Sequence, residues 1–428
     1  MLATLVIIFA LTYAAIVLEH PLKVNKSASA LIGAGLLWTI YAVAIPDQIL
    51  VNEHLAISLT GAAQIVFFLM GAMTIVEVID AHNGFEVITS RIRTDSLSTL
   101  LWQTGFVTFF LSAVLDNLTT AIVMISLMKK LLGKDEDRLY FAGIIVISAN
   151  AGGAWSPIGD VTTTMLWIGG QVTAIPIMKG LFLASLVNML LPLAIASYIF
   201  RGESVTPPVK RRAEVDQVKA TPFEQNLMFV MGLGILICVP IFKSITHLPP
   251  FLGILFGLGI LWLTGELIHS RKDEEIREQL TIARALKQID LSSIVFFTAI
   301  LLAVATLEHS HILTSLATWL ERTVGQQEVI VTLIGLASAV IDNVPLVAAS
   351  MGMYSLAQHP ADSFLWEFIA YCAGTGGSIL IIGSAAGVVA MGLEKISFFW
   401  YLRRISWLAL LGYFAGIAAC ILQYRLTV

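Results

Sequence analysis

The sequence predicts an all-α polytopic membrane protein made of two inverted repeats, each with five transmembrane helices and a re-entrant hairpin. Three observations support this prediction: the composition, the long apolar segments, and motifs that recur once in each half of the chain. Of the 428 residues, 57% are hydrophobic and 13% are charged, and the mean hydropathy is +0.86. Soluble domains are roughly 45–50% apolar and about 25% charged, so most of this chain is expected to lie within a bilayer.

Eight uninterrupted apolar segments approach or reach the roughly 20 helical residues that span a hydrocarbon core about 30 Å thick. They are 2–18, 28–46, 57–79, 175–200, 225–242, 248–266, 291–308 and 405–424. The first lacks a basic region before it, which predicts a retained helix rather than a cleaved signal. Four more apolar segments carry Asp, Asn, Gly, Pro, Ser or Thr near their middle: 97–132, 138–170, 327–357 and 364–394. Such interrupted helices are tolerated where protein or a cavity satisfies the backbone.

The distribution of lysine and arginine predicts the orientation, because cytoplasmic loops carry an excess of both. We expect 97–132 and 327–357 to be hairpins and the other ten segments to cross the cell inner membrane, with both termini periplasmic. Nearly all of the 25 basic residues, Lys26 included, then lie on the cytoplasmic side. The exceptions are Lys179, Lys243, Arg322 and Arg425. If segment 97–132 crossed the membrane instead, Arg91 and Arg93 would lie on the opposite side from Lys129 and Lys130.

An internal repeat defines the predicted domains. Residues 112–117 (SAVLDN) match 338–343 (SAVIDN), and 149–153 (ANAGG) match 373–377 (AGTGG) in the same order. The N-terminal repeat is expected to span 1–200, with hairpin 97–132 and broken helix 138–170. The C-terminal repeat is expected to span 225–428, with hairpin 327–357 and broken helix 364–394, after a cytoplasmic linker, 201–224. An odd number of crossings in each half inverts the second repeat, as in many secondary transporters.

Asp116 and Asp342 are placed by this repeat at the two hairpin tips. A carboxylate near the bilayer centre costs about 2.5–3.5 kcal/mol even on insertion scales, unless it is paired, protonated or solvated. The cores of the four interrupted segments contain no lysine or arginine. We therefore expect no fixed cationic partner and a cation, rather than an anion, as the substrate. An alternative is that these residues only cap the helices that follow, since Asp is a good N-cap.

Carboxylate, amide and hydroxyl oxygens in the same segments are the expected ligands, because hard cations prefer oxygen. The predicted ion-binding and proton-exchange residues are Asp116, Asn117, Asn150, Asp160, Thr162, Asp342 and Asn343. Further candidates are Ser112, Ser156, Thr163, Ser338, Thr375, Ser378 and Ser384. The backbone is expected to unwind at Gly152, Gly153, Gly376 and Gly377, which frees carbonyl oxygens. Glu77 is a candidate for a proton path or, equally, an interfacial carboxylate.

The two halves differ at the matching positions. Asp160 aligns with Ser384, and Asn150 aligns with Gly374. The first half is therefore richer in ligands and is expected to hold the main site. Asp342 and Asn343 would complete that site or form a second one.

The motifs resemble those of the NhaD-type sodium/proton antiporters of the ion transporter superfamily. The similar parts are the SAVLDN and SAVIDN tips, the run ANAGGAWSPIGDVTT and the run GTGGS, within roughly 57–424. The resemblance implies a scaffold and a transport domain, a homodimer, and exchange of Na⁺ or Li⁺ for protons without a cofactor. It assigns functional roles to Asp116, Asn117, Asn150, Asp160, Thr162, Ser338, Asp342 and Asn343.

The predicted function is antiport in which Na⁺ and H⁺ compete for one or more of Asp116, Asp160 and Asp342, with alternating access. An anion or metalloid carrier on the same fold, for arsenite or a dicarboxylate, is the alternative. An intramembrane enzyme is the other class, but the sequence has no HExxH motif and no GxSxG motif with a partnered histidine. The net charge of −4 offers no basic face for nucleic acid.

Overall fold

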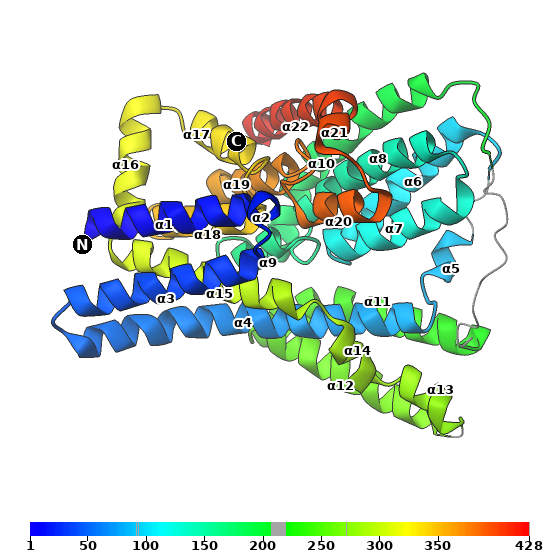
Figure 1. Cartoon of the computed structure of the whole chain (residues 1–428), viewed down its shortest axis with the longest axis horizontal. Helices are drawn as coiled ribbons and strands as arrows, with labels where there is room; N and C mark the ends of the chain where they lie inside the picture. Colours follow the sequence, from blue (N-terminus) through cyan, green and yellow to red (C-terminus); the bar gives the residue numbers. More distant parts are fainter. Residues whose placement is uncertain (91, 93, 207–219, 271, 428) are drawn as a thin grey trace.

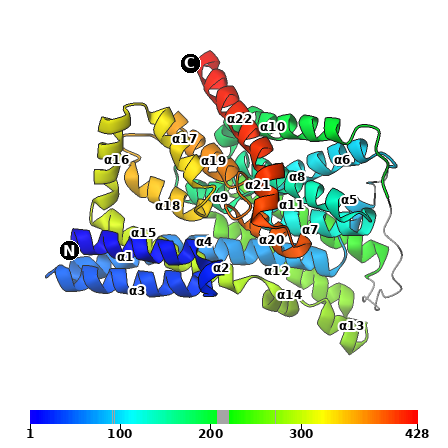
Figure 2. The same ribbon diagram turned by 45° about the horizontal axis from the view of Figure 1, so that its top comes forward.

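The computed structural model is helical and describes residues 1–90, 92, 94–206, 220–270 and 272–427. Residues 207–219 of the predicted linker lie outside this part of the chain, as do Arg91 and Arg93, two of the basic residues used for the orientation. The helices form two layers that face each other (Figure 1); Figure 2 shows the same helices after a 45° rotation, in which the layers partly overlap.

The first layer, which we name the support layer, contains six long helices. They are α1 (Leu2–Val17), α3 (Lys26–Ala44), α4 (Gln48–Ala81), α11 (Pro222–Thr246), α12 (Pro250–His269) and α15 (Leu291–His309). In this layer α3 packs against α15, α12 packs against α4, and α4 packs against α15. Each half of the chain therefore contributes helices that pack on the other half.

The second layer, which we name the hairpin layer, holds the interrupted segments. It contains α6 (Leu97–Ser112), α7 (Asn117–Leu131), α8 (Asp135–Ala154), α9 (Val161–Ile168), α10 (Ala174–Ile199), α17 (Gln327–Ala337), α18 (Asn343–Met353), α19 (Phe364–Gly376), α20 (Ala385–Glu394) and α22 (Ser406–Thr427). The remaining short helices are α2 (Glu19–Leu22), α5 (Glu86–Thr89), α13 (Glu274–Gln279), α14 (Ile282–Gln288), α16 (Ile312–Val324) and α21 (Phe398–Arg404).

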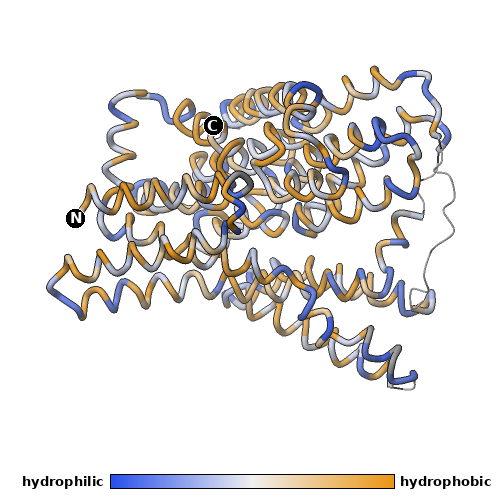
Figure 3. Tube along the Cα trace, viewed as in Figure 1, coloured by the Kyte–Doolittle hydropathy of each residue, from blue (hydrophilic) through white to orange (hydrophobic). Residues whose placement is uncertain are grey.

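Seven of the described helices are long and apolar enough to span a membrane: α3, α4, α10, α11, α12, α15 and α22. An eighth span results if α20 and α21, which meet at 113°, count as one. Apolar residues cover the long helices, and hydrophilic residues gather mainly at their ends (Figure 3). The chain is therefore a polytopic membrane protein, as predicted. The main difference in length is α4, which begins at 48 because the Asp47 side chain accepts hydrogen bonds from the amides of Ile49 and Leu50.

Each interrupted segment consists of two helices separated by a short break. The breaks are 113–116, 155–160, 338–342 and 377–384, and the last residue of each caps the following helix. The two ends of the first segment contact the same stretch of chain. The Leu97 amide donates to the backbone carbonyl of Glu203, and the Gly133 amide donates to the backbone carbonyl of Thr206. The segment therefore turns back at its break.

The glycines near the breaks have a different role from the one expected. Gly152 and Gly153 lie within α8 and Gly376 lies within α19, so the expectation that these three unwind the backbone is wrong. Gly377 is the C-cap of α19 and keeps right-handed helical angles. A Cβ atom on Gly152 would overlap the carbonyl oxygen of Phe109. Gly152 and Gly376 therefore let two helices approach closely, whereas Gly153 and Gly377 face the backbone of the break that follows them.

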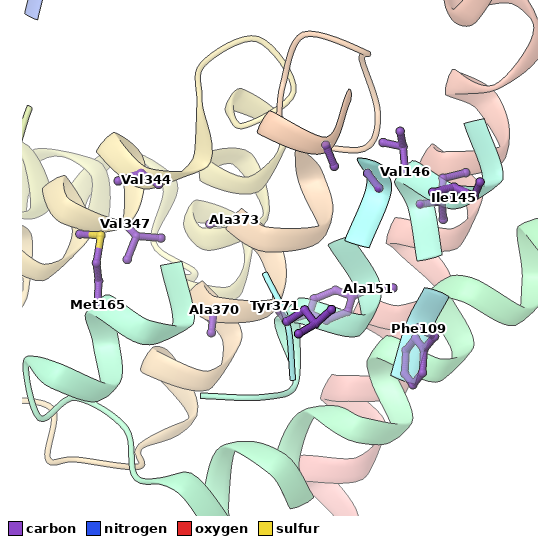
Figure 4. Packing of buried hydrophobic residues seen from close by; sticks show 14 of the residues in the cluster. Phe109, Ile145, Val146, Ala151, Met165, Val344, Val347, Ala370, Tyr371 and Ala373 are labelled. Atoms are coloured by element: carbon purple, nitrogen blue, oxygen red, sulfur yellow. The ribbon is translucent and has the colours of Figure 1, made fainter. Parts of the chain in front are cut away.

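Apolar side chains from both halves pack around this crossing. Phe109, Ala151 and Tyr371 come from α6, α8 and α19, and all three are fully buried. Figure 4 shows them within one cluster of hydrophobic side chains. This packing holds the breaks of the two halves near each other.

The closeness of the α6–α8 crossing makes Gly152→Ala a direct test of the packing. We expect this substitution to destabilise the protein by about 1–3 kcal/mol, because the added methyl group must displace the backbone of α6. The measurement is thermal unfolding in detergent. Gly35→Ala in α3 is the matched control, since no atom lies within 4 Å of its added Cβ. Equal melting temperatures for both variants would contradict the packing described here.

Candidate functional site

The breaks of the two halves are joined by a buried hydrogen-bond network centred on Asn150. The Asn117 amide donates to Asn150 Oδ1 over 2.9 Å. The Asn150 amide in turn donates to the hydroxyl oxygens of Ser378 and Ser384, over 2.8 and 2.9 Å. Asn150 is fully buried. A single side chain of α8 thus connects the first hairpin tip to the break between α19 and α20.

Asp160 lies between the asparagines of the two hairpin tips. Asn117 Nδ2 is 2.8 Å from Asp160 Oδ2, and Asn343 Nδ2 is 3.3 Å from the same oxygen. The backbone amide of Thr162 donates to Asp160 Oδ1 over 3.0 Å, so the carboxylate also caps α9. Asp160 is 2% exposed, and no described lysine or arginine forms an ion pair with it. Neutral donors and a helix N-terminus therefore stabilise this buried carboxylate.

Asp116 occupies the matching position at the tip of the first hairpin. Its Oδ1 accepts the Thr119 amide over 2.8 Å and its Oδ2 accepts the Thr119 hydroxyl over 2.7 Å. The carboxylate thus caps α7 and is half-buried. The capping role considered from the sequence for Asp116 and Asp342 is present at both, since Asp342 accepts the Val344 amide at the start of α18. Asp160 caps α9 in the same way.

A cavity of about 60 Å³ borders these two carboxylates. Asp116, Asn117 and Asp160 supply its polar wall, while α4, α11 and α15 supply mostly apolar walls that include Phe68 and Phe297. A single water needs roughly 10–15 Å³ on this measure. The cavity therefore has room for a small cation with several waters at the polar end.

The polar residues that line the cavity are Asp116, Asn117, Asp160, Thr164 and Ser293, without a described cation among them. In the described part of the chain, no group of three or more His, Cys, Asp and Glu side chains could together hold a metal ion. Any cation here would instead rely on one or two carboxylates with amide, hydroxyl and backbone oxygens. Such oxygen donors suit a hard cation.

Asp342 differs from the other two acidic residues because it has a cationic partner. The Lys26 ammonium at the start of α3 lies 3.0 Å from Asp342 Oδ2. The expectation that no fixed cation is available at the tips is therefore wrong for Asp342. The reason is that the partner comes from a different segment, 316 residues away in the chain. Lys26 is the first residue of α3 and lies beside the tip that carries Asp342.

The two tip serines form equivalent contacts in the two halves. Ser112 donates its hydroxyl to the Ala149 carbonyl over 2.7 Å, and Ser338 donates to the Ala373 carbonyl over 2.8 Å. Each serine thus ties the first arm of a hairpin to the neighbouring broken helix. Their hydroxyl oxygens are fully buried and serve the packing of the breaks.

The remaining hydroxyl candidates make local contacts. Thr163 donates to the carbonyl of Asp160, Thr375 donates to the carbonyl of Tyr371, and Ser156 accepts from the amide of Ile158. Thr162 is the exception, because its buried Oγ1 has no hydrogen-bond partner among the described residues. Thr162 lies two residues after Asp160 in the chain.

Glu77 lies apart from this site. It is half-buried in α4 and is not among the residues that line the cavity at Asp116 and Asp160. Its assignment to a proton path stays a prediction.

Three contacts of the site were not found from the sequence. They involve Lys26 at Asp342, the Thr119 hydroxyl at Asp116, and the Tyr401 hydroxyl, which donates to the Ser378 carbonyl over 2.8 Å. Thr119 could have been found, because its position three residues after a capping Asp is where a capped amide is expected. Lys26 and Tyr401 carry no such local signal.

Known proteins resemble this chain over nearly its whole length. Sodium/proton antiporter 1 of Arabidopsis thaliana is 49% identical over 422 residues, which cover 98% of this chain and 72% of that protein. Sodium/proton antiporter 2 of the same plant is 45% identical over 414 residues, covering 96% and 97%. The Na(+)/H(+) antiporter NhaD of Vibrio cholerae is 30% identical over 441 residues, covering 96% and 89%.

Two further comparisons concern the wider family and the fold. A family model described as "Citrate transporter" matches residues 13–367. The crystal structure of the YdaH transporter of Alcanivorax borkumensis superimposes with a TM-score of 0.60 and covers 94% of this chain and 99% of that one. At 13% identity, this likeness shows a shared fold. The chain belongs to the NhaD family of sodium/proton antiporters, within the wider family of the citrate-transporter model.

Proposed function

We propose that this protein exchanges Na⁺ for H⁺ by letting the two ions compete for Asp116 and Asp160. The observation that carries this proposal is the cavity whose polar end is formed by these carboxylates and Asn117. A carboxyl group that holds a proton does not also hold Na⁺ at the same oxygens. Competition of this kind couples the two ions without communication between distant sites.

The asparagines explain how the carboxylate is stabilised when no cation is bound. Asn117 and Asn343 direct their amide groups to Asp160. On cation binding, rotation of either side-chain amide would replace a donor by a carbonyl oxygen ligand. The Thr162 hydroxyl, which has no described partner, would complete the coordination. Ser378 and Ser384 hold Asn150 and thereby position Asn117 rather than binding the ion themselves.

The movement is proposed to occur between the two layers. In an inverted-repeat transporter, one bundle rocks against the other around a site at the repeat interface. Here the pairs α6–α7 and α17–α18 would be the two hairpins, and α8–α9 and α19–α20 the two broken helices, of repeats 1–200 and 225–428. The cavity lies between the breaks of the hairpin layer and helices α4, α11 and α15 of the support layer. This position of the cavity supports a movement of the two layers that would expose the proposed site.

The cellular setting is likewise a proposal. The basic residues favour ten crossings of a cell inner membrane with both termini outside. The resemblance to the ion transporter superfamily supports a homodimer and transport of Li⁺ as well as Na⁺.

An anion carrier is the second candidate, because the matching family model is described as a citrate transporter. A citrate site needs positive charge or several free donors directed at the ligand. The described cavity instead presents Asp116 and Asp160. Citrate-dependent uptake without sodium–proton exchange in reconstituted vesicles would favour this second candidate.

Asp160→Asn tests the proposed exchange site. We expect at least a hundredfold loss of Na⁺-induced proton flux in proteoliposomes, because the amide keeps the size of the side chain but cannot exchange a proton. The control is Asp273→Asn, which changes an exposed carboxylate at the start of α13. Full flux in a correctly inserted Asp160→Asn variant would contradict the assignment of the exchanged proton to Asp160.

Competition also predicts how pH changes the kinetics. As the pH falls, protons occupy the carboxylates, so the Na⁺ concentration for half-maximal flux should rise, by up to about tenfold per pH unit for one exchanged proton. The maximal rate at saturating Na⁺ should change far less. The measurement is a Na⁺ titration of flux at several pH values, equal on both sides of the membrane before each addition. A half-maximal concentration that is independent of pH would exclude simple competition.

A further inference from the structure

The ion pair between Lys26 and Asp342 connects the two layers of the protein. Lys26 is the first residue of α3 in the support layer, and Asp342 caps α18 in the hairpin layer. Their charged atoms are 3.0 Å apart, and the side chains are 25% and 14% exposed. Burial to this degree reduces the screening that weakens surface ion pairs.

Other contacts hold the lysine in this position. The backbone amide of Lys26 donates to the Glu19 carboxylate over 3.1 Å. The ammonium also lies 4.5 Å from the centre of the Phe296 ring, which gives it a second favourable electrostatic contact. Asp342 uses its other oxygen to accept the Val344 amide. The pair is thus part of the packed structure around the second hairpin tip.

The matching carboxylates of the two halves, Asp116 and Asp342, have different hydrogen-bond and charge partners. Asp116 borders the cavity, and its two oxygens are bound by the amide and hydroxyl of Thr119. The residue that corresponds to Thr119 in the second half is Pro345, which has neither group to donate. Asp342 does not line the cavity and is bound by an ammonium instead. The Lys26 ammonium therefore pairs with Asp342, whereas the matching carboxylate of the first half, Asp116, borders a cavity that a transported cation could enter.

We propose that Lys26 is a tethered counter-cation that neutralises Asp342, so that Na⁺ and H⁺ exchange only at Asp116 and Asp160. This inference rests on the proposed function and narrows it, since three acidic residues would otherwise compete for the two ions. Lys26 acts as a positioning residue, because it sets the charge beside the exchange site without binding the transported ion.

The pair lies close enough to the proposed exchange site for an unpaired charge on either side chain to change the affinity of that site for Na⁺. Asn343, the neighbour of Asp342, contacts Asp160 directly. Asp342→Asn leaves an unpaired ammonium, which repels Na⁺. Lys26→Met leaves an unpaired carboxylate, which attracts Na⁺. We expect shifts of roughly tenfold in opposite directions, because charges interact strongly in a medium of low effective dielectric constant.

The experiment measures the Na⁺ concentration for half-maximal proton flux in the full-length protein in proteoliposomes. Asp342→Asn should raise this concentration, Lys26→Met should lower it, and the double variant should fall between them because the two charges are removed together. Lys26→Arg, which keeps the charge, should stay close to the wild type. The control is Lys23→Gln, which removes an exposed ammonium three residues away.

Two results would overturn the inference. If both single variants raise the half-maximal concentration, the pair is only a structural link between the layers. If the double variant melts like the wild type but shows no exchange, Asp342 itself carries a transported ion. Absence of Na⁺-dependent flux in the wild type would instead overturn the proposed function, so the two failures are distinguishable.

Discussion

The structure depends on keeping carboxylates inside a membrane protein, where an isolated negative charge is strongly disfavoured. Each of the three acidic residues at the breaks is stabilised in its own way. Asp116 accepts hydrogen bonds from the amide and hydroxyl of Thr119, and Asp160 accepts hydrogen bonds from the side-chain amides of Asn117 and Asn343. Asp342 has the Lys26 ammonium. In the proposed mechanism, these differences determine which carboxylates exchange a proton for Na⁺.

Breaking the helices is what makes this stabilisation available. A continuous helix would use its amides internally, whereas a break exposes N–H groups at the start of the second helix. The last residue of each break caps that helix through its side chain, from Asp116 in the first hairpin to Ser384 in the last broken helix. Gly152 and Gly376 let the helices around the breaks approach backbone to backbone. The same feature therefore stabilises the charges and places the two halves in contact.

Contact between the halves gives the site its asymmetry. Asn150 reaches from α8 to Ser378 and Ser384, while Asn343 reaches from the second tip to Asp160. The corresponding position to Asn150 is Gly374, which offers no side chain. Amide side chains accordingly gather around Asp160 of the first half. The second half contributes hydroxyls, an amide and Asp342, whose lysine partner belongs to the first half. This distribution supports the proposal of a single exchange site near the contact between the two halves.

The sequence by itself determined the helical membrane class, the positions of the four interrupted segments, and the residues Asp116, Asn117, Asn150 and Asp160 that come together at the breaks. These follow from local properties, because hydropathy and polar interruptions are readable along the chain. Only the tertiary structure decided that Gly152 serves a helix crossing and that Lys26 binds Asp342. Both depend on contacts between segments far apart in the chain. The residues around Lys26 give no signal for a partner that lies 316 residues away, so packing alone sets this partner.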